Sequence, residues 1–481
     1  MGLGKERREE EEIYITEGLE NEEMGLPLLS VEKGTDEKDD VDVEKLVSWS
    51  NIWKMSLPAL VKESLAFLPG LVRTAVIGHT SYSEIGQQAF SIISSIMSPI
   101  GWVFVFLING VTSQVGGEYG KSKFKNIGRM IRLVITAALL LGFLTQIPLL
   151  ILTPSILRWF DAKDKIFELT VPFLRMRLIT VPFLLLARGT TGILQGLQRV
   201  NSAMIVQFMI VGFDLVGHYV FLTLQKKPLI YSAYSTCFAQ VAASMIGFLI
   251  LVVPKSSKRL RIFSSSSSKE KKEVTWSAFI SSSFVLFLRS VALQMSFVLA
   301  AKVTSNQLPT KYMSAYLIIL QLWFFNSFVI DGFAIVANMV GSRLIAAGEL
   351  PAFRLLRARL LSVTVTLGFI LMGIFWLFEE RILGIVSNSD ATIELCRNVW
   401  YILLIMQVPN SLCFYGDGLL LAAKEFKFLS KYMWVGFLGF YLPIMMFQYI
   451  VPPMLDFTFI AIASMSCVRF MSGLSLSYYK Y

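Results

Sequence analysis

Long apolar runs recur along this chain from residue 53 to residue 477, and only short polar interruptions separate them. About 20 apolar residues are enough to cross a bilayer as a helix, so this stretch has room for about twelve crossings. Inside hydrocarbon every backbone polar group needs a partner within the protein, and for runs of this length the helix supplies it. The chain is therefore predicted to be an all-α polytopic membrane protein. The predicted spans are 53–79, 87–115, 130–153, 168–193, 203–224, 230–253, 276–302, 312–342, 357–378, 395–423, 431–451 and 456–477.

The overall composition excludes an ordinary soluble protein. Hydrophobic residues make up 54% of the chain and charged residues 16%, against about 45–50% and about 25% in soluble domains. The four cysteines stand in or beside apolar spans and lack the CxxC or Cys/His spacing of a disulfide framework or a zinc site. We therefore expect no metal site and no bound cofactor. The cysteines are Cys237, Cys396, Cys413 and Cys467.

Two polar stretches divide the chain into its predicted domains. Residues 1–48 hold 16 acidic and 6 basic side chains and are nearly free of aromatic ones, so this acidic tail is predicted to be disordered. Residues 254–275 are basic and rich in serine, which is typical of a flexible linker. The linker leaves six spans on each side. The resulting domains are an N-lobe bundle at 49–253, a C-lobe bundle at 276–477 and a short tail at 478–481.

Basic residues gather in alternate loops between the predicted spans. They are dense near residues 121–132, 255–272, 343–359 and 424–431, and sparse in the loops between these. Loops rich in Lys and Arg remain on the cytoplasmic side of a membrane. Both termini are therefore predicted to be cytoplasmic, in either a plasma membrane or an organelle membrane.

The two halves of the chain echo one another, which predicts two pseudo-symmetric six-helix bundles. Gly/Pro-interrupted segments at matching places in two halves indicate a transporter with its pathway at the repeat interface. The matching segments are Asn109-Gly110 with Asp331-Gly332, and Pro182 to Gly192 with Pro409 to Gly418.

Several local patterns in both halves are shared with one transporter family. In the first half they are Pro58-Ala-Leu, Val72-Arg-Thr-Ala-Val-Ile-Gly78, Gly86-Gln-Gln-Ala-Phe90 and Arg177-Leu-Ile-Thr-Val-Pro182. In the second half they are Leu320-Gln-Leu-Trp-Phe-Phe-Asn-Ser-Phe-Val-Ile-Asp-Gly-Phe-Ala-Ile335 and the stretch from Pro409 to Gly418. Together they cover most of residues 50–475. The chain resembles the multidrug and toxic compound extrusion (MATE) transporters, in particular the DinF-like and plant citrate-exporter branch.

The resemblance implies a central cavity between two bundles that opens alternately to either side, with efflux driven by a proton or sodium gradient. Two positions depart from the family pattern. The first helix of the family usually carries Val-Asp-Thr-Ala, and this chain has Arg73 in place of the Asp. The fifth helix in this branch carries Asn-x3-Asp, whereas this chain reads Asp214-x3-His218. The proton site of the family is therefore expected to be altered here.

Ionisable side chains at membrane depth are functional candidates, because each costs about 2.5–3.5 kcal/mol to insert. The candidates for proton or cation coupling are Asp214, His218, Asp331 and Asp417. Asp214 and His218 are four residues apart on one helix face, where a carboxylate and an imidazole can exchange a proton near neutral pH. The alternative is that both side chains only satisfy backbone groups or an arginine.

Three arginines are the candidates for the substrate cavity: Arg73, Arg188 and Arg289. Arg73 is expected either to pair with Asp214 or to line the cavity as a fixed positive charge. For Arg289 the alternatives are a structural ion pair with Asp331 and a role in coupling or substrate binding. Three arginines favour an organic anion such as citrate, while the wider family suggests amphipathic organic cations.

No enzyme motif competes with a transport function. The chain has no P-loop, no HExxH and no GxSxG motif, so it is expected to use an ion gradient as its energy source and not to be an enzyme. The sequence predicts a monomeric proton-coupled antiporter with a small organic solute and no nucleic-acid partner. The alternatives are a lipid-linked oligosaccharide flippase and a channel or receptor-like membrane protein.

Overall fold

The computed structural model describes the backbone of residues 43–78, 83–160, 162, 164–252, 276–308, 310–386, 390–450 and 454–480. Inside the helices it leaves out the side chains of residues 67–78, 83–88, 91, 305–307, 310–311, 386, 474 and 476–480. Most of the predicted tail and the whole predicted linker at 254–275 lie outside the described residues. The chain separates into two compact units, Met1–Val43 and Glu44–Tyr481, and the second unit contains all the predicted spans.

The described elements are all helices. A short helix, α2 (Val43–Val47), precedes the first half of the fold. The first half consists of α3 (Trp49–Gly78), α4 (Ser83–Val103), α5 (Phe106–Gly120), α6 (Phe124–Trp159), α7 (Asp164–Ile179), α8 (Val181–Gly196), α9 (Val200–His218), the π-helix η1 (Tyr219–Leu224) and α10 (Ile230–Val252). The second half consists of α12 (Trp276–Gln307), α13 (Thr310–Ala347), α14 (Leu350–Leu377), α15 (Glu379–Val386), α16 (Asp390–Ile405), α17 (Gln407–Ala422), α18 (Phe426–Gly436), the π-helix η2 (Phe437–Tyr441), α19 (Leu442–Phe447) and α20 (Leu455–Lys480).

Each predicted span falls on one helix or on consecutive helices joined by a short break. The largest shift of an end is seven residues, at the start of α14. Over the described residues, ten helices are long and apolar enough to cross a membrane, or eleven if the bent pair α16 and α17 forms one span. The helix α3 is not among these, and the side chains of its second half lie outside the described residues. The predicted all-α polytopic class is confirmed.

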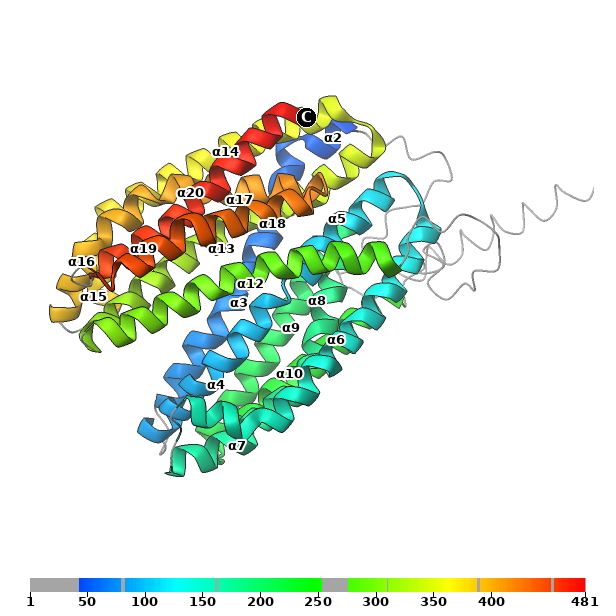
Figure 1. The fold of residues 1–481 in the computed structure, drawn as a ribbon. Coiled ribbons are helices and arrows are strands. Elements are labelled where there is room, and N and C mark those ends of the chain that lie inside the picture. Colours follow the sequence, from blue (N-terminus) through cyan, green and yellow to red (C-terminus); the bar gives the residue numbers. More distant parts are fainter. Residues whose placement is uncertain are drawn as a thin grey trace, which may run out of the picture. The chain divides into compact units, whose positions relative to one another are not determined.

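The helices of each half pack mainly on one another. In the first half α8 contacts α5, α6 and α10, and in the second half α17 contacts α13, α14 and α20. Two helices run between these groups (Figure 1). One is α3, which contacts both α9 and α13, and the other is α12, which contacts α4 and α5 as well as α13 and α18. Side chains of both halves therefore meet along α3 and α12.

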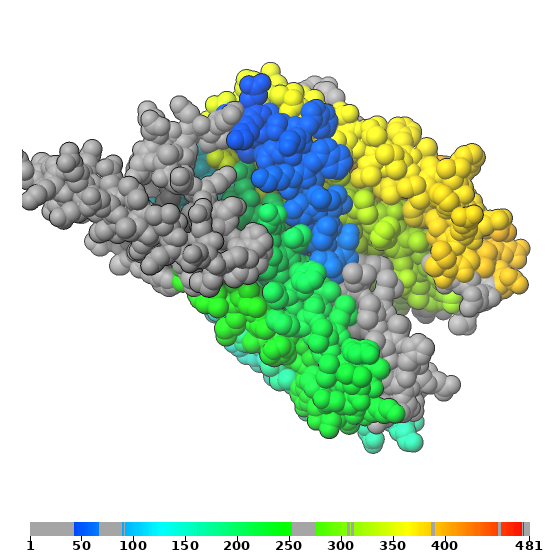
Figure 2. All heavy atoms as spheres, turned by 180° about the vertical axis from the view of Figure 1, so that it is seen from behind, coloured from blue at the N-terminus to red at the C-terminus, as the bar shows by residue number. Residues whose placement is uncertain are grey.

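The start of α3 lies against the second half. Arg359 of α14 donates a hydrogen bond to the carbonyl of Val47 at 2.5 Å, and its guanidinium lies 5.6 Å from the ring centre of Trp49. The rings of Trp53 and Phe333 of α13 meet edge-on at 5.4 Å. Figure 2 shows the start of α3, in blue, next to α14, in yellow. The first span is therefore anchored on the half to which it does not belong in sequence.

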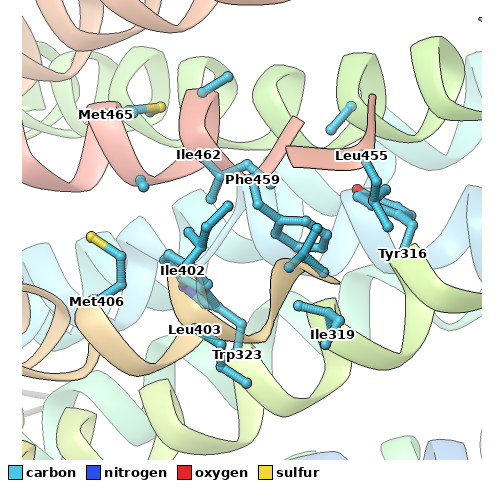
Figure 3. Packing of buried hydrophobic residues seen from close by; sticks show 14 of the residues in the cluster. Tyr316, Ile319, Trp323, Ile402, Leu403, Met406, Leu455, Phe459, Ile462 and Met465 are labelled. Carbon is cyan, nitrogen blue, oxygen red and sulfur yellow. The ribbon is translucent and has the colours of Figure 1, made fainter. Parts of the chain in front are cut away.

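The second half has a buried core between α13, α16 and α20 (Figure 3). Tyr316 and Trp323 of α13, Leu403 of α16, and Phe459 and Ile462 of α20 are all at most 5% exposed. The lipid around a membrane protein is as apolar as these side chains, so their burial brings no hydrophobic gain. They stabilise the bundle through close packing with one another. This core gives the helices that carry the site a fixed frame.

Each half contains one helix break at the matching place. The helix ends at Thr180 between α7 and α8, just before Pro182, and at Met406 between α16 and α17, just before Pro409. The second break bends the chain by 50°. Proline lacks an N–H and its ring clashes with the preceding turn, so a helix does not continue regularly through it. The paired prolines of the sequence thus mark paired breaks.

A glycine after each break lets two helices approach closely. A Cβ atom on Gly192 of α8 would lie 2.8 Å from the carbonyl oxygen of Leu107 in α5. A Cβ atom on Gly418 of α17 would lie 2.5 Å from the carbonyl oxygen of Ala334 in α13. Both distances are shorter than Cβ contacts in real proteins, so the backbones could not approach this closely around any larger residue. The same close contact is therefore built in both halves.

Four turns repeat one backbone conformation and show the pseudo-symmetry directly. They join α5 to α6, α8 to α9, α13 to α14 and α17 to α18, and each contains one residue in the left-handed region. The following N–H bonds to the carbonyl five residues earlier, which is the Schellman pattern. The left-handed residues are Ser122 (φ 54°), Gln198 (φ 61°), Gly348 (φ 86°) and Lys424 (φ 58°).

Contacts between the halves cluster near these turns. The guanidinium of Arg343 donates to the side-chain oxygen of Gln198 and lies 4.5 Å from the ring centre of Tyr119. The hydroxyl of Ser113 donates to the carbonyl of Leu421 at 2.5 Å. Because the basic loops of the sequence coincide with these turns, the end joined in this way is the one predicted to face the cytoplasm.

This topology is tested by labelling single cysteines in otherwise cysteine-free protein. We expect a cysteine replacing Ser264 to react with a membrane-impermeant reagent only after permeabilisation, because the Lys/Arg bias places residues 254–275 inside. A cysteine replacing Ser387 is expected to react in intact cells. The opposite pair of results would reverse the orientation.

Candidate functional site

A buried carboxylate in α17 is shared by two arginines from different helices. Nη2 of Arg289 in α12 lies 2.5 Å from Oδ2 of Asp417, and Nη2 of Arg469 in α20 donates to the same oxygen. The side chains of all three residues are at most 8% exposed. Two guanidinium groups facing one carboxylate give this cluster a net charge of +1 when all are ionised.

Arg469 is held more firmly than Arg289. Its guanidinium also lies 5.7 Å from the ring centre of Phe414 in α17, which adds a cation–π contact. The helices that carry Asp417 and Arg469 touch at two glycines, because a Cβ atom on Gly416 would lie only 2.9 Å from the Cα of Gly473. This close backbone contact fixes α17 against α20.

Asp331 lies near this cluster but does not join it. Its side chain in α13 is half-buried, and among the described residues it has no hydrogen-bond or ion-pair partner. Of the two alternatives for Arg289, the structural ion pair with Asp331 is not the one found in this structure, because Arg289 pairs with Asp417. Position along one helix does not reveal which neighbouring helix a side chain faces. Among the described residues, the charged groups within electrostatic reach of Asp331 are Glu63 and Lys62 of α3, Asp417 of α17, Arg289 of α12 and Arg469 of α20.

Two adjacent residues of opposite charge in α3, Lys62 and Glu63, lie near Asp331, so the first half contributes charges to its surroundings. Nζ of Lys62 lies 2.5 Å from Oε1 of Glu63, and Lys62 is only 4% exposed. The glycine after Asp331 makes this approach possible, since a Cβ atom on Gly332 would lie 2.9 Å from the backbone nitrogen of Leu60. No role for Lys62 was predicted from the sequence. The signal available was a Lys-Glu dipeptide inside an apolar span.

Arg188, one of the predicted cavity residues, lies in α8 on the first-half side. Its side chain is half-buried and within electrostatic reach of Glu63. Its Nη2 lies 3.4 Å from the position that a Cβ atom would take on Gly101 of α4, and its Nε has no hydrogen-bond partner among the described residues. Arg188 and Glu63 thus place a second pair of opposite charges near α3. The side chain of Arg73 lies outside the described residues.

Asp214 and His218 share one face of α9, as their spacing predicts. Nδ1 of His218 lies 2.6 Å from the backbone carbonyl oxygen of Asp214 and 3.6 Å from its carboxylate Oδ1. Nε2 of the same ring lies 2.6 Å from the hydroxyl of Ser232 in α10. When the neutral imidazole carries its proton on Nδ1, this nitrogen donates to the carbonyl of Asp214 and Nε2 accepts from the hydroxyl of Ser232. Both ring nitrogens then have a hydrogen-bond partner. Both side chains are at most 3% exposed.

A π-helical segment follows this pair directly. The α-helical pattern ends at His218 and continues as η1, and the second half has its own π-helix, η2, directly after α18. Isolated π-helical turns occur often at functional sites, since they place one extra residue in the turn and redirect the side chains around it. The π-helical segment favours a functional site at Asp214 and His218, and the role of the two residues in coupling stays a prediction. Among the described residues no cluster of His, Cys, Asp or Glu has the arrangement of a metal site.

Comparisons with known proteins bear on the family. The MatE family model matches residues 58–220 and 286–447. Protein DETOXIFICATION 43 of Arabidopsis thaliana is 23% identical over 55% of this chain, and the match spans only about half of that protein, 48%. DNA damage-inducible protein F of Escherichia coli (strain K12) is 22% identical, over 82% of this chain and 85% of that protein.

A solved structure shares the fold over nearly the whole chain. It is described as the outward-facing conformation of a multidrug resistance MATE family transporter of the MOP superfamily. The TM-score is 0.75 at 15% identity, with 93% of this chain and 98% of that chain covered. Since the family model covers more than half of the residues, in both halves, the chain belongs to the MatE family and is a multi-pass membrane transporter of the multidrug and toxic compound extrusion type.

Proposed function

We propose that this chain is a proton-coupled antiporter that exports a small organic solute, with Asp331 as the residue at which proton and solute compete. The observation that carries the proposal is a half-buried carboxylate without a partner among the described residues, placed where α3 of the first half meets α13 of the second. Such a group inside a membrane protein is costly and is retained for a task. No bound cofactor is needed, because the proton gradient supplies the energy.

The charges around Asp331 decide which solute competes with a proton. The set made of Asp331 and the five described groups within its reach has three positive and three negative members, so this set is neutral when all are ionised. A proton on Asp331 leaves this set with a charge of +1. A cationic solute beside Asp331 is then repelled, whereas an anion is attracted. Exchange of a proton for solute therefore favours an organic cation.

The number of arginines favoured an organic anion, but the partners of these arginines do not. Arg289 shares the carboxylate of Asp417 with Arg469, and Arg188 lies within reach of Glu63, so neither arginine is an isolated positive charge that faces an anion. A citrate-like anion would bind together with the proton and not in exchange for it. A ligand shifts the equilibrium between the two cavity orientations only if it binds them differently, and competition at Asp331 provides such a difference.

The test is uptake into vesicles that contain the purified chain. A labelled organic cation and labelled citrate are offered separately, each with an imposed pH gradient, with a sodium gradient or with neither. We expect the cation to accumulate only with the pH gradient, in the direction opposite to the protons. Accumulation of citrate together with protons would replace the cation assignment, and accumulation driven by sodium alone would contradict proton coupling.

We further propose that the pair in α9 tunes the pH dependence. Asp214→Asn is expected to change the pH profile of transport more than it changes the amount of folded protein, because an amide is similar in size to the carboxylate but does not titrate. His218→Gln is expected to shift the profile, since imidazole titrates closest to the working pH. The measurement compares initial uptake rates at matched expression. An unchanged profile in both variants would remove the pair from the mechanism.

A further inference from the structure

The buried charges of the second half are unevenly distributed. Both arginines donate to one oxygen of Asp417, and its other oxygen, Oδ1, has no hydrogen-bond partner among the described residues. The Nε atoms of Arg289 and Arg469 are likewise without one there. Asp331, in contrast, has no cation bonded to it among the described residues, although both guanidinium groups lie within electrostatic reach. One carboxylate thus holds two arginines while its neighbour holds none.

Among the described residues, Arg469 has anchors besides Asp417 and Arg289 has none. Arg469 stacks on Phe414 and lies on a helix fixed against α17 by the contact between Gly416 and Gly473. The structure shows no corresponding ring contact for Arg289, among the described residues, and α12 runs between the two halves. The ammonium group of Lys62 is bonded to Glu63 at 2.5 Å, and among the described residues it makes no ion pair with Asp331.

We propose that Arg289 exchanges between Asp417 and Asp331, pairing with Asp331 when that residue is ionised and returning to Asp417 when it is protonated. Arg469 makes the exchange possible, because it keeps Asp417 paired after Arg289 leaves. The inference rests on the proposed role of Asp331 as the proton site and assigns Arg469 as a positioning residue. The arrangement in this structure, with both arginines on Asp417, corresponds to the protonated state of Asp331.

The exchange follows from the cost of unpaired buried charge. Burying an ionised carboxylate without a partner is strongly unfavourable, and so is removing one partner of a buried ion pair. With Asp331 ionised, two arginines on Asp417 leave one carboxylate uncompensated, whereas one arginine on each carboxylate compensates both. With Asp331 neutral, this advantage disappears. Because α12 contacts α4 and α5 of the first half, movement of Arg289 offers a route from protonation to the relative position of the halves.

The charged groups facing Asp331 from the helices packed around it do not remove this preference. Glu63 and Asp417 are negative and disfavour its ionised form, while Lys62, Arg289 and Arg469 are positive. Since Lys62 is bonded to Glu63, the positive charge of Lys62 offsets part of the effect of Glu63 at Asp331. The position of Arg289 is therefore the main variable in the balance.

The exchange is tested by electron cryo-microscopy of the full chain in lipid nanodiscs, without solute, at about pH 5 and about pH 9, on either side of the range in which perturbed carboxylates titrate. We expect Arg289 on Asp417 at the lower pH and within about 2.7–2.9 Å of an Asp331 oxygen at the higher one. Arg469 should stay on Asp417 in both maps and serves as the internal reference.

Three variants separate the exchange from a general effect of pH. Asp331→Asn should keep Arg289 on Asp417 at both pH values, and Asp331→Ser serves the same purpose if the first variant does not fold. In the Arg469→Gln variant Arg289 should also stay on Asp417, because the departure of Arg289 would leave Asp417 without a cation. The control is Arg397→Gln, an arginine with a side chain 54% exposed and paired with Glu379, which should leave the exchange unchanged.

Two results would overturn the proposal. One is that Arg289 stays on Asp417 at the higher pH in the unmodified chain. The other is that it moves to the same extent in the Asp331→Asn variant. Neither result depends on solute, so the exchange can fail while proton-coupled transport is observed, and it can hold in a chain that exports none of the solutes offered.

Discussion

Replacing Asp417 with asparagine is expected to remove most of the folded protein from the membrane. Two buried guanidinium groups would then face a neutral amide and lose the only carboxylate bonded to them among the described residues. Removing one partner of a buried ion pair costs about 3–5 kcal/mol, and here a single change affects two such pairs. A loss of this size is a large part of the stability of a typical folded protein.

The measurement is the yield of monodisperse protein and its thermal midpoint in detergent. The matched control is Asp390→Asn, which removes an exposed carboxylate at the start of α16 and should have little effect. Adding Arg289→Gln and Arg469→Gln to Asp417→Asn should restore much of the yield, because no uncompensated charge then remains in the cluster. If Asp417→Asn alone keeps the yield of the control, charge pairing with Asp417 does not hold the two arginines in place.

The positions of the helices along the chain could be predicted, because each span is encoded by the residues of its own segment. A long apolar run predicts a span, and a proline after a break predicts where the helix ends. The paired glycines could be predicted as well, since Gly192 and Gly418 stand at matching places and both serve a close contact between helices. Helical spacing also brought Asp214 and His218 to one face, although Nδ1 of the imidazole lies closer to the backbone carbonyl of Asp214 than to its carboxylate.

The partners of the buried charges could not be predicted, because they come from distant helices. Arg289 and Asp417 are 128 residues apart, and nothing in either span indicates which of the neighbouring helices its side chain faces. Arg469 was missed, although it lies inside the last predicted span, 456–477. Its position between Val468 and Phe470, inside an apolar run, was the only available signal.

These corrections change the expected role of Asp331. If Asp331 were paired with Arg289, replacing Asp331 with a neutral residue would leave Arg289 unpaired and reduce the amount of folded protein. Because Arg289 pairs with Asp417, Asp331 has no ion pair to lose among the described residues, and its side chain is already half-buried. The prediction for Asp331 is therefore opposite to that for Asp417, although the two residues lie within electrostatic reach of one another.

Asp331→Asn is expected to abolish transport driven by a pH gradient while the amount of folded protein stays near that of the unmodified chain. The amide fixes the surrounding set at a charge of +1, as a permanent proton would, so no proton is exchanged for solute. The measurement compares accumulation driven by a pH gradient with solute exchange in its absence, in vesicles of equal protein content. The control is Asp456→Asn, whose carboxylate accepts a hydrogen bond from Tyr401 at an exposed position, 3.1 Å away.

The pattern of the two activities distinguishes the possible outcomes for Asp331. Loss of gradient-driven accumulation with exchange retained would show that the cavity still opens to both sides and that only the coupling is gone, since a solute can be exchanged without moving protons. A loss of folded protein as large as that of Asp417→Asn would make Asp331 a structural residue. Unchanged accumulation would move the proton site away from Asp331, and Asp417 in α17 and the pair of Asp214 with His218 in α9 would then be the remaining predicted sites.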